Sequence, residues 1–131
     1  MRYVPRVVLA LMMLTNFGRG CIHAFAPDGG AHSIAGLDLS TARQTILSLF
    51  ALMGFHQVVA GGFQLYVLAL RRDLVLLALV LQMAETLLGV VNLYFYRTLP
   101  VAVPGAPFNA AVLVVLAGAV LIAAQEGRRR A

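Results

Sequence analysis

The sequence contains no lysine, and only five of its 131 residues are acidic. Charged residues make up 11% of the chain and hydrophobic residues 61%, whereas a soluble domain has about a quarter of its residues charged and about half apolar. The scarcity of charge therefore excludes an ordinary soluble domain and indicates an integral membrane protein. The length allows one domain, residues 1–131, and we expect an all-α fold, a transmembrane four-helix bundle.

Cysteine is almost absent as well, since Cys21 is the only one. An intrachain disulfide, a CxxC redox pair and a cysteine zinc site are therefore excluded. The sequence also lacks a Gly-rich phosphate loop, a Ser-His-Asp order and an HExxH pattern. These absences remove the common enzyme signatures, leave open whether the protein is an enzyme, and indicate no particular cofactor.

All ten basic residues are arginines, and they occur singly, as one pair and as a final run of three. A net charge of +5 would suit a nucleic-acid partner, but arginines at the ends of apolar segments are typical of membrane topology signals. We therefore expect the lipid bilayer to surround the protein, and we expect no nucleic acid as a partner.

Four apolar stretches predict transmembrane helices. The stretch before Pro27 resembles a signal peptide, but Pro27 would then be the first residue after cleavage, so we expect a retained helix. Thr41 to Gln44 fit a capping box at the start of the second helix, Asp73 is placed to cap the third, and Pro107 suits the first turn of the fourth. The expected helices cover residues 5–26, 42–70, 74–98 and 108–125.

The arginine positions also orient these helices. With the amino terminus in the cytoplasm, seven arginines lie inside and three lie outside or near the outer interface. Such an excess predicts that both termini are cytoplasmic. The inner set is Arg2, Arg6, Arg71, Arg72, Arg128, Arg129 and Arg130, and the outer set is Arg19, Arg43 and Arg97.

The third predicted helix carries polar residues within its apolar run. Gln82, Glu85, Gly89 and Asn92 follow one another at steps of three, four and three residues, so they share one helix face. An ionisable group at bilayer depth is costly, and it normally faces the protein interior and has a partner there. The sequence therefore predicts an intramembrane carboxylate at Glu85 that meets polar groups from other helices.

Counting from the helix ends places Asn16, His56 and Glu85 near the bilayer midplane. Arg19 lies about 4.5 Å nearer the outside than Asn16, and its long side chain can still reach Glu85, so it is the expected counter-charge. The alternatives are that Glu85 is a neutral acid or shares a proton with His56. Glu85 and His56 are the candidate catalytic residues, because both could handle a proton. The rest of the expected polar column consists of Gln57, Gln64 and Gln82 on the inner side, and His23 and Asn92 on the outer side.

The histidines do not have the spacing of a metal or haem site. His23 and His56 belong to different predicted helices and differ in depth by about 10 Å, whereas axial haem ligands must face each other across one iron. His32 belongs to a glycine-rich loop. We therefore expect no metal-ligating residues.

The second predicted helix and the turn after it resemble the middle of DoxX-like proteins, which are small four-helix bacterial membrane proteins. Their second helix has a Gly-x-x-Glu-x-x-Gly-Gly type of pattern and is followed by a basic turn; here Gln57 stands where glutamate is commoner. The resemblance implies a four-helix fold in the bacterial inner membrane, and some members are small subunits of quinone-linked oxidoreductases. It is carried by Gly54-Phe55-His56-Gln57-Val58-Val59-Ala60-Gly61-Gly62-Phe63-Gln64-Leu65 and by Arg71-Arg72.

Two functions of different classes fit this sequence. The first is a packing or accessory subunit of a membrane complex or homo-oligomer, because the small residues of the fourth helix permit close contact with other helices. Its partners would be other membrane subunits or further copies. The alternative is a small membrane enzyme or carrier for a lipid-like or quinone-like molecule, an apolar ligand handled by Glu85 and His56. A third function, conduction along the polar column, would need several copies.

Overall fold

The computed structural model describes residues 3–97 and 106–129, and these residues form helices, turns and loops without a strand. The helices are α1 (Val4–Phe25), α2 (Arg43–Leu70), α3 (Val75–Val91) and α4 (Ala106–Arg128). A short 3-10 helix, η1 (Arg72–Leu74), precedes α3, and a π-helical turn, η2 (Asn92–Tyr96), follows it. The loop expected after η2, together with Arg2 and Arg130, lies largely outside the described residues.

Four helical stretches of the described chain are long and apolar enough to cross a membrane. They are Val4–Phe25, Arg43–Leu70, Arg72–Tyr96 and Pro107–Arg128. Large apolar side chains are exposed on all of them, among them Leu14, Val59, Leu88 and Leu121. Exposed apolar surface of this extent is typical of helices that face lipid or another protein. The prediction of an all-α protein with four membrane-length helices is confirmed.

The starts of α2 and α3 differ from the predicted caps. The chain enters α2 through Ala42, which has a left-handed φ of 53°, and no side chain caps the first turn. The predicted capping box from Thr41 to Gln44 is therefore wrong, since such a box needs a hydroxyl at an extended cap residue. Asp73 does not cap α3 either, because its carboxylate accepts two hydrogen bonds from Arg71, at 3.0 and 2.7 Å.

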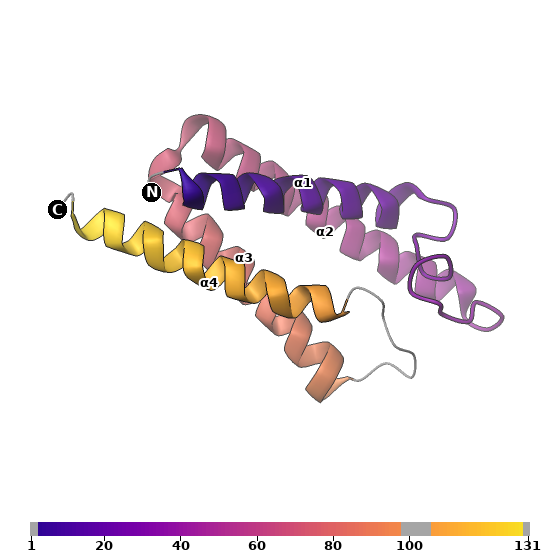
Figure 1. Cartoon of the computed structure of the whole chain (residues 1–131). Coiled ribbons are helices and arrows are strands. Elements are labelled where there is room, and N and C mark those ends of the chain that lie inside the picture. Colours follow the sequence, from indigo (N-terminus) through magenta and orange to yellow (C-terminus); the bar gives the residue numbers. More distant parts are fainter. Residues whose placement is uncertain (1–2, 98–105, 130–131) are drawn as a thin grey trace.

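Both ends of the chain and the turn between α2 and α3 lie at the same end of the bundle, which we call the closed end (Figure 1). All four helices pack together here around an apolar core. Each helix contributes one side chain with no exposed surface: Leu9, Val67, Leu79 and Leu116. Val8, Val75, Ala78 and Ala119 complete this core.

The α1–α2 contact is unusually close where two glycines meet. A Cβ atom added at Gly54 would lie 2.5 Å from the backbone nitrogen of Ala24 and 2.7 Å from the carbonyl oxygen of Gly20. Farther along α2, Gly61 leaves room for the ring of Phe17. Because backbone meets backbone at this crossing, α1 and α2 form one tight helix pair.

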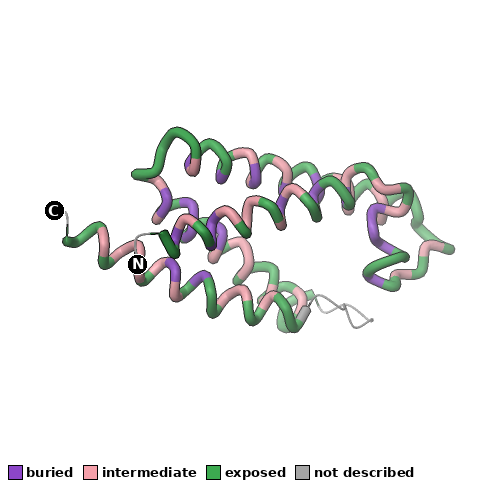
Figure 2. Tube along the Cα trace, turned by 45° about the horizontal axis from the view of Figure 1, so that its top comes forward, coloured by how far each residue is buried: buried purple, intermediate pink, exposed green. Residues whose placement is uncertain are grey.

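At the opposite end, which we call the open end, α3 and α4 diverge from α1 and α2 (Figure 1). None of the residues 87–96 of α3 and η2 is buried, and neither is any of the residues 107–115 of α4. By contrast, α1 and α2 keep buried positions at this end, such as His23 and Gly54 (Figure 2). The two helix pairs are therefore joined at one end and separate at the other.

Candidate functional site

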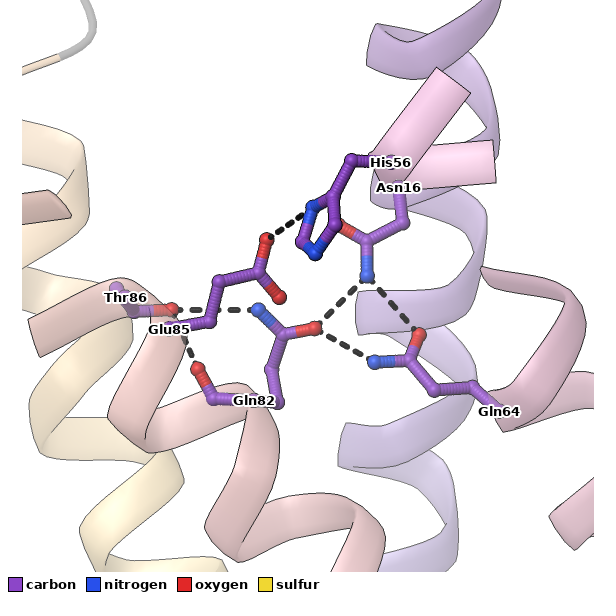
Figure 3. A network of polar contacts seen from close by, with 6 residues as sticks. All are labelled: Asn16, His56, Gln64, Gln82, Glu85 and Thr86. Atoms are coloured by element: carbon purple, nitrogen blue, oxygen red, sulfur yellow. Dashed lines mark hydrogen bonds and ion pairs between the residues drawn. The ribbon is translucent and has the colours of Figure 1, made fainter. Parts of the chain in front are cut away.

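Three buried amide side chains join α1, α2 and α3 midway along the bundle (Figure 3). The Asn16 side-chain nitrogen donates to Gln64 Oε1 at 3.1 Å and to Gln82 Oε1 at 2.8 Å. Gln64 Nε2 also donates to Gln82 Oε1, at 2.6 Å. We call these residues the amide triad. Each of them is a residue of the predicted polar column, and each comes from a different helix.

Thr86 extends the amide triad along α3. Gln82 Nε2 lies 3.3 Å from Thr86 Oγ1, and this hydroxyl donates to the Gln82 carbonyl oxygen at 2.9 Å. Thr86 is not a residue of the predicted polar column, although its position four residues after Gln82 puts it on the same helix face. The hydroxyl satisfies the amide nitrogen that Gln82 does not use within the triad.

Glu85 and His56 form a second polar group beside the triad, and their side chains point toward each other from α3 and α2 (Figure 3). His56 Nδ1 lies 3.5 Å from Glu85 Oε1, so the two make an ion pair when the imidazole is protonated. The pair is far from buried: 65% of the His56 side chain and 36% of the Glu85 side chain are exposed. It lies toward the open end, one helical turn beyond Gln82 on α3.

The structure therefore divides the expected midplane cluster into two parts. Asn16 bonds to the glutamines of the buried triad, whereas Glu85 and His56 meet at the surface. Arg19 is exposed, and within the described residues no ion pair joins it to Glu85. The expected counter-charge is thus corrected from Arg19 to His56, because the buried face of α1 runs through Asn16, Gly20 and His23 and leaves Arg19 outside it.

His23 fastens the loop after α1 to the helix pair and takes no part in the triad. Its Nδ1 lies 2.7 Å from the carbonyl oxygen of Gly29, and its ring meets the ring of Phe50 edge to face at 5.4 Å. Since a carbonyl only accepts hydrogen bonds, Nδ1 carries the proton. His23 Nε2 is buried and has no hydrogen-bond partner among the described residues.

Gln57 and Asn92 are the remaining residues of the predicted column, and both lie apart from the triad. Gln57 is buried on α2, and its Oε1 has no hydrogen-bond partner among the described residues. Asn92 is exposed in η2, where its backbone oxygen accepts a hydrogen bond of 2.8 Å from the Arg97 nitrogen. The continuous column is therefore reduced to a compact central network.

The loop between α1 and α2 is held by the half-buried carboxylate of Asp28. Asp28 accepts hydrogen bonds from the backbone nitrogens of Gly30 and Ser33, at 3.0 and 2.7 Å. The Ser33 and Gly30 bonds lower the pKa of Asp28 from 3.8 to about 2, because they stabilise the charged carboxylate. Hydrogen bonds from Ser40 lower the pKa of Asp38 in the same way.

No group of three or more His, Cys, Asp or Glu side chains in the described part of the chain is arranged to hold a metal ion. Comparisons of the sequence and the structure with family models, with curated proteins and with solved structures returned no match. The chemistry of the site must therefore be argued from its own geometry. That geometry consists of a buried triad that links three helices, and an exposed acid–base pair beside it.

Proposed function

We propose that the protein is a non-catalytic accessory subunit of a membrane complex, and that its open end is completed by a transmembrane helix of another membrane protein. The observation that carries the proposal is the exposure of the Glu85–His56 pair midway along membrane-length helices. Lipid chains offer no hydrogen bonds, so a carboxylate in contact with them is strongly disfavoured. A hydroxyl or amide side chain on the partner helix would supply the missing bonds.

The unburied face of the open end supports the same proposal. Leu87, Leu88 and Val91 are exposed on α3, and Phe108 and Val114 are exposed on α4. These residues give the open end an apolar surface, which is the composition of a helix-packing interface in a membrane. The closed end also exposes apolar side chains, such as Leu70 and Leu121, but its inward-facing side chains pack against one another across all four helices.

Photo-crosslinking in the membrane tests this proposal. Benzoylphenylalanine replaces Leu88, which is 69% exposed at the open end. The control position is Leu121, which is 64% exposed on the half of α4 nearer the closed end. We expect a protein adduct from position 88 and lipid adducts alone from position 121. In the same assay Glu85→Gln retains the adduct, because an amide still forms hydrogen bonds, whereas Glu85→Leu loses most of it.

The mass of the adduct identifies the occupant. An adduct larger than two chains shows a different membrane protein, as proposed, whereas an adduct of two chains replaces the proposal with a homo-oligomer. Lipid adducts alone at position 88, together with a lone monomer in native mass spectrometry of the gently extracted protein, would overturn the accessory role. An equally strong adduct in Glu85→Leu would show that the polar pair does not contribute to the interface.

We further propose a multi-pass protein of the bacterial inner membrane with both termini in the cytoplasm, as in DoxX-like proteins. Its support is that the closed end holds both chain ends and the Arg71–Arg72 turn (Figure 1), because clustered arginines favour the cytoplasmic side. Labelling of single cysteines tests the topology. A cysteine at Arg129, combined with Cys21→Ser, should react with an impermeant thiol reagent only after the cells are opened.

A second candidate is a carrier or enzyme for a lipid-like or quinone-like molecule, which a specific observation favours. His56 borders an open depression of about 580 Å³ on the surface of α2, where its neighbours are Leu49, Leu52, Met53, Phe55 and Val59. An apolar surface with one polar group suits an apolar ring that bears a hydrogen-bonding oxygen. This candidate predicts that a long-chain quinone co-purifies with the protein and is lost in His56→Leu. Retention of the quinone in that variant would contradict it.

A further inference from the structure

A small cavity at the closed end is lined by charged side chains from three parts of the chain. Its volume is about 180 Å³. Arg6 comes from the first turn of α1, Arg72 and Asp73 from η1, and Glu126 from the last turn of α4, while Val75 and Leu76 form part of its apolar wall. The cavity thus lies where the helix ends meet, and it borders the apolar core at Val75.

Most of these charges have no ion-pair partner among the described residues. Asp73 is held by Arg71 through an ion pair of 2.7 Å. Within the described residues no ion pair joins Arg6, Arg72 or Glu126 to another side chain. Arg72 uses only its Nε, in a long hydrogen bond of 3.4 Å to the Leu68 carbonyl oxygen. Two guanidinium groups and one carboxylate therefore face the same concave space with donors and acceptors unused.

These unused groups match a ligand that carries one negative and one positive group. Guanidinium groups bind phosphate oxygens through paired hydrogen bonds, and two of them at one site favour a phosphate strongly. A carboxylate beside them repels a purely anionic ligand but attracts an ammonium group. The cavity is smaller than the 300–1,000 Å³ typical of sites that enclose a whole drug-sized ligand, so it suits a headgroup whose remainder lies outside.

We propose that this cavity binds the headgroup of a phospholipid that bears a primary amine, of the phosphatidylethanolamine type. Arg6 and Arg72 bind the phosphate, and Glu126 binds the ammonium group. The proposal rests on the proposed membrane insertion, which brings the ends of membrane-length helices to the level of the lipid phosphates. The acyl chains then follow the apolar surface of α3, which begins beside the cavity at Leu76 and continues to the exposed Leu77.

Native mass spectrometry of the full chain, released from detergent micelles with added lipid, tests the site. The probes are phosphatidylethanolamine, phosphatidylglycerol with the same acyl chains, and soluble phosphoethanolamine. We expect Arg6→Gln and Arg72→Gln each to weaken phosphatidylethanolamine binding roughly fivefold, the loss expected for one partly exposed ion pair. Arg128→Gln is the matched control: Arg128 is exposed at the same end and does not line the cavity, so the loss stays below about twofold.

Glu126→Gln separates the ammonium contact from the phosphate contact. We expect the native chain to prefer phosphatidylethanolamine to phosphatidylglycerol, and Glu126→Gln to lose that preference while still binding both lipids. Equal binding of the two lipids by the native chain would overturn the ammonium assignment. An equal loss in Arg128→Gln would overturn the site, because the attraction would then be diffuse. If soluble phosphoethanolamine bound as tightly as the lipid, the site would recognise the free headgroup, and the assignment of a lipid as the ligand would be overturned.

Two measurements keep these outcomes distinct from misfolding and from failure of the proposed function. Circular dichroism and gel filtration establish that each variant is helical and monodisperse, and Arg72→Gln stands in if Arg6→Gln does not fold. Carbonate extraction tests membrane insertion separately. A chain that stays in the membrane but shows no lipid preference contradicts the headgroup site alone, and a chain that carbonate releases contradicts the membrane role itself.

Discussion

The closed and open ends of this bundle are built from helices of similar composition, yet they pack differently. At the closed end, one fully buried aliphatic side chain from each helix meets the others. At the open end, α1 and α2 stay in contact through glycines, and no residue of α3 and η2 beyond Thr86 is buried. Apolar character alone therefore does not decide which helices touch, because lipid is as good a solvent for leucine as another helix is.

The boundary between the two ends is marked by the amide triad. Asn16, Gln64 and Gln82 bond to one another across three helices, and a hydrogen bond between helices has no competitor in lipid. Beyond this level the next polar residues, Glu85 and His56, already lie at the surface. The triad thus holds α3 against the α1–α2 pair at the last level where a buried side chain of α3 meets them.

The largest effect is expected where the α1–α2 contact is closest. Gly54→Ala places a Cβ atom 2.5 Å from a backbone nitrogen, which cannot move aside as a side chain can. Overpacking of this kind costs about 3 kcal/mol or more, and the variant should separate α1 from α2 at the open end. The free energy of unfolding, measured by SDS titration in mixed micelles, checks this prediction.

Gly62→Ala is its matched control, because no atom lies within 4 Å of the added Cβ. Alanine favours a helix over glycine by up to about 1 kcal/mol, so this variant is expected to be as stable as the native chain or slightly more so. Equal destabilisation by the two substitutions would show that the glycine contact does not hold the helix pair together.

The next effect concerns the core of the closed end. Leu79→Ala removes a side chain with no exposed surface, and the cavity alone should cost about 2 kcal/mol, since in lipid little is gained or lost by transfer of the leucine itself. Leu88→Ala, at a 69% exposed position on the same helix, should change stability by less than about 0.5 kcal/mol. Similar losses for the two variants in SDS titration would mean that the ends are packed alike.

A smaller effect is expected in the amide triad. Gln82→Leu leaves Asn16 and Gln64 buried without their shared acceptor, and interhelical hydrogen bonds in membranes are each worth about 0.6–2 kcal/mol. A double-mutant cycle with Asn16→Leu measures the coupling between α1 and α3. The coupling should be positive and of the order of 1 kcal/mol. Strictly additive losses would show that the triad does not link these helices.

The smallest effect lies in the loop at the open end. Because the folded pKa of Asp28 is lowered to about 2 from 3.8, its carboxylate favours the folded loop above about pH 4, and this contribution is lost as the pH falls from 3.8 toward 2. Amide exchange at Ser33 should accelerate over that interval. Asp28→Asn, which removes the titrating group, should abolish this part of the pH dependence. A carboxyl resonance of Asp28 that titrates near 3.8 would contradict the prediction.

The sequence predicted the helices better than it predicted their ends. Segments rich in leucine, valine and alanine must form helices to satisfy their backbone in an apolar setting, and the observed bounds of α1 and α2 differ from the predicted ones by at most one residue. The predicted caps were wrong for two local reasons. The Asp73 carboxylate binds Arg71 in place of the helix start, and Ala42 adopts a left-handed conformation ahead of α2. Such local competition is not visible in a pattern of residue types.

The candidate site was predicted by residue type and depth but not by partner. Counting along the helices grouped Asn16, Gln64, Gln82, His56 and Glu85 at neighbouring levels. It could not say which of them face inward, because helix rotation is set by packing against neighbours. The glycine contact fixes which face of α1 packs against α2, and Arg19 lies outside that face. Glu85 therefore pairs with His56 of α2.

The sequence by itself determined that this chain forms four membrane-length helices and that polar groups interrupt the first three of them at mid-height. Both follow from composition and spacing, which act along one helix at a time. Only the tertiary structure decided that three amides are buried together while an acid and a histidine meet at an open surface. That decision depends on how closely helices approach each other, and at Gly20 and Gly54 the approach is set by the absence of two side chains.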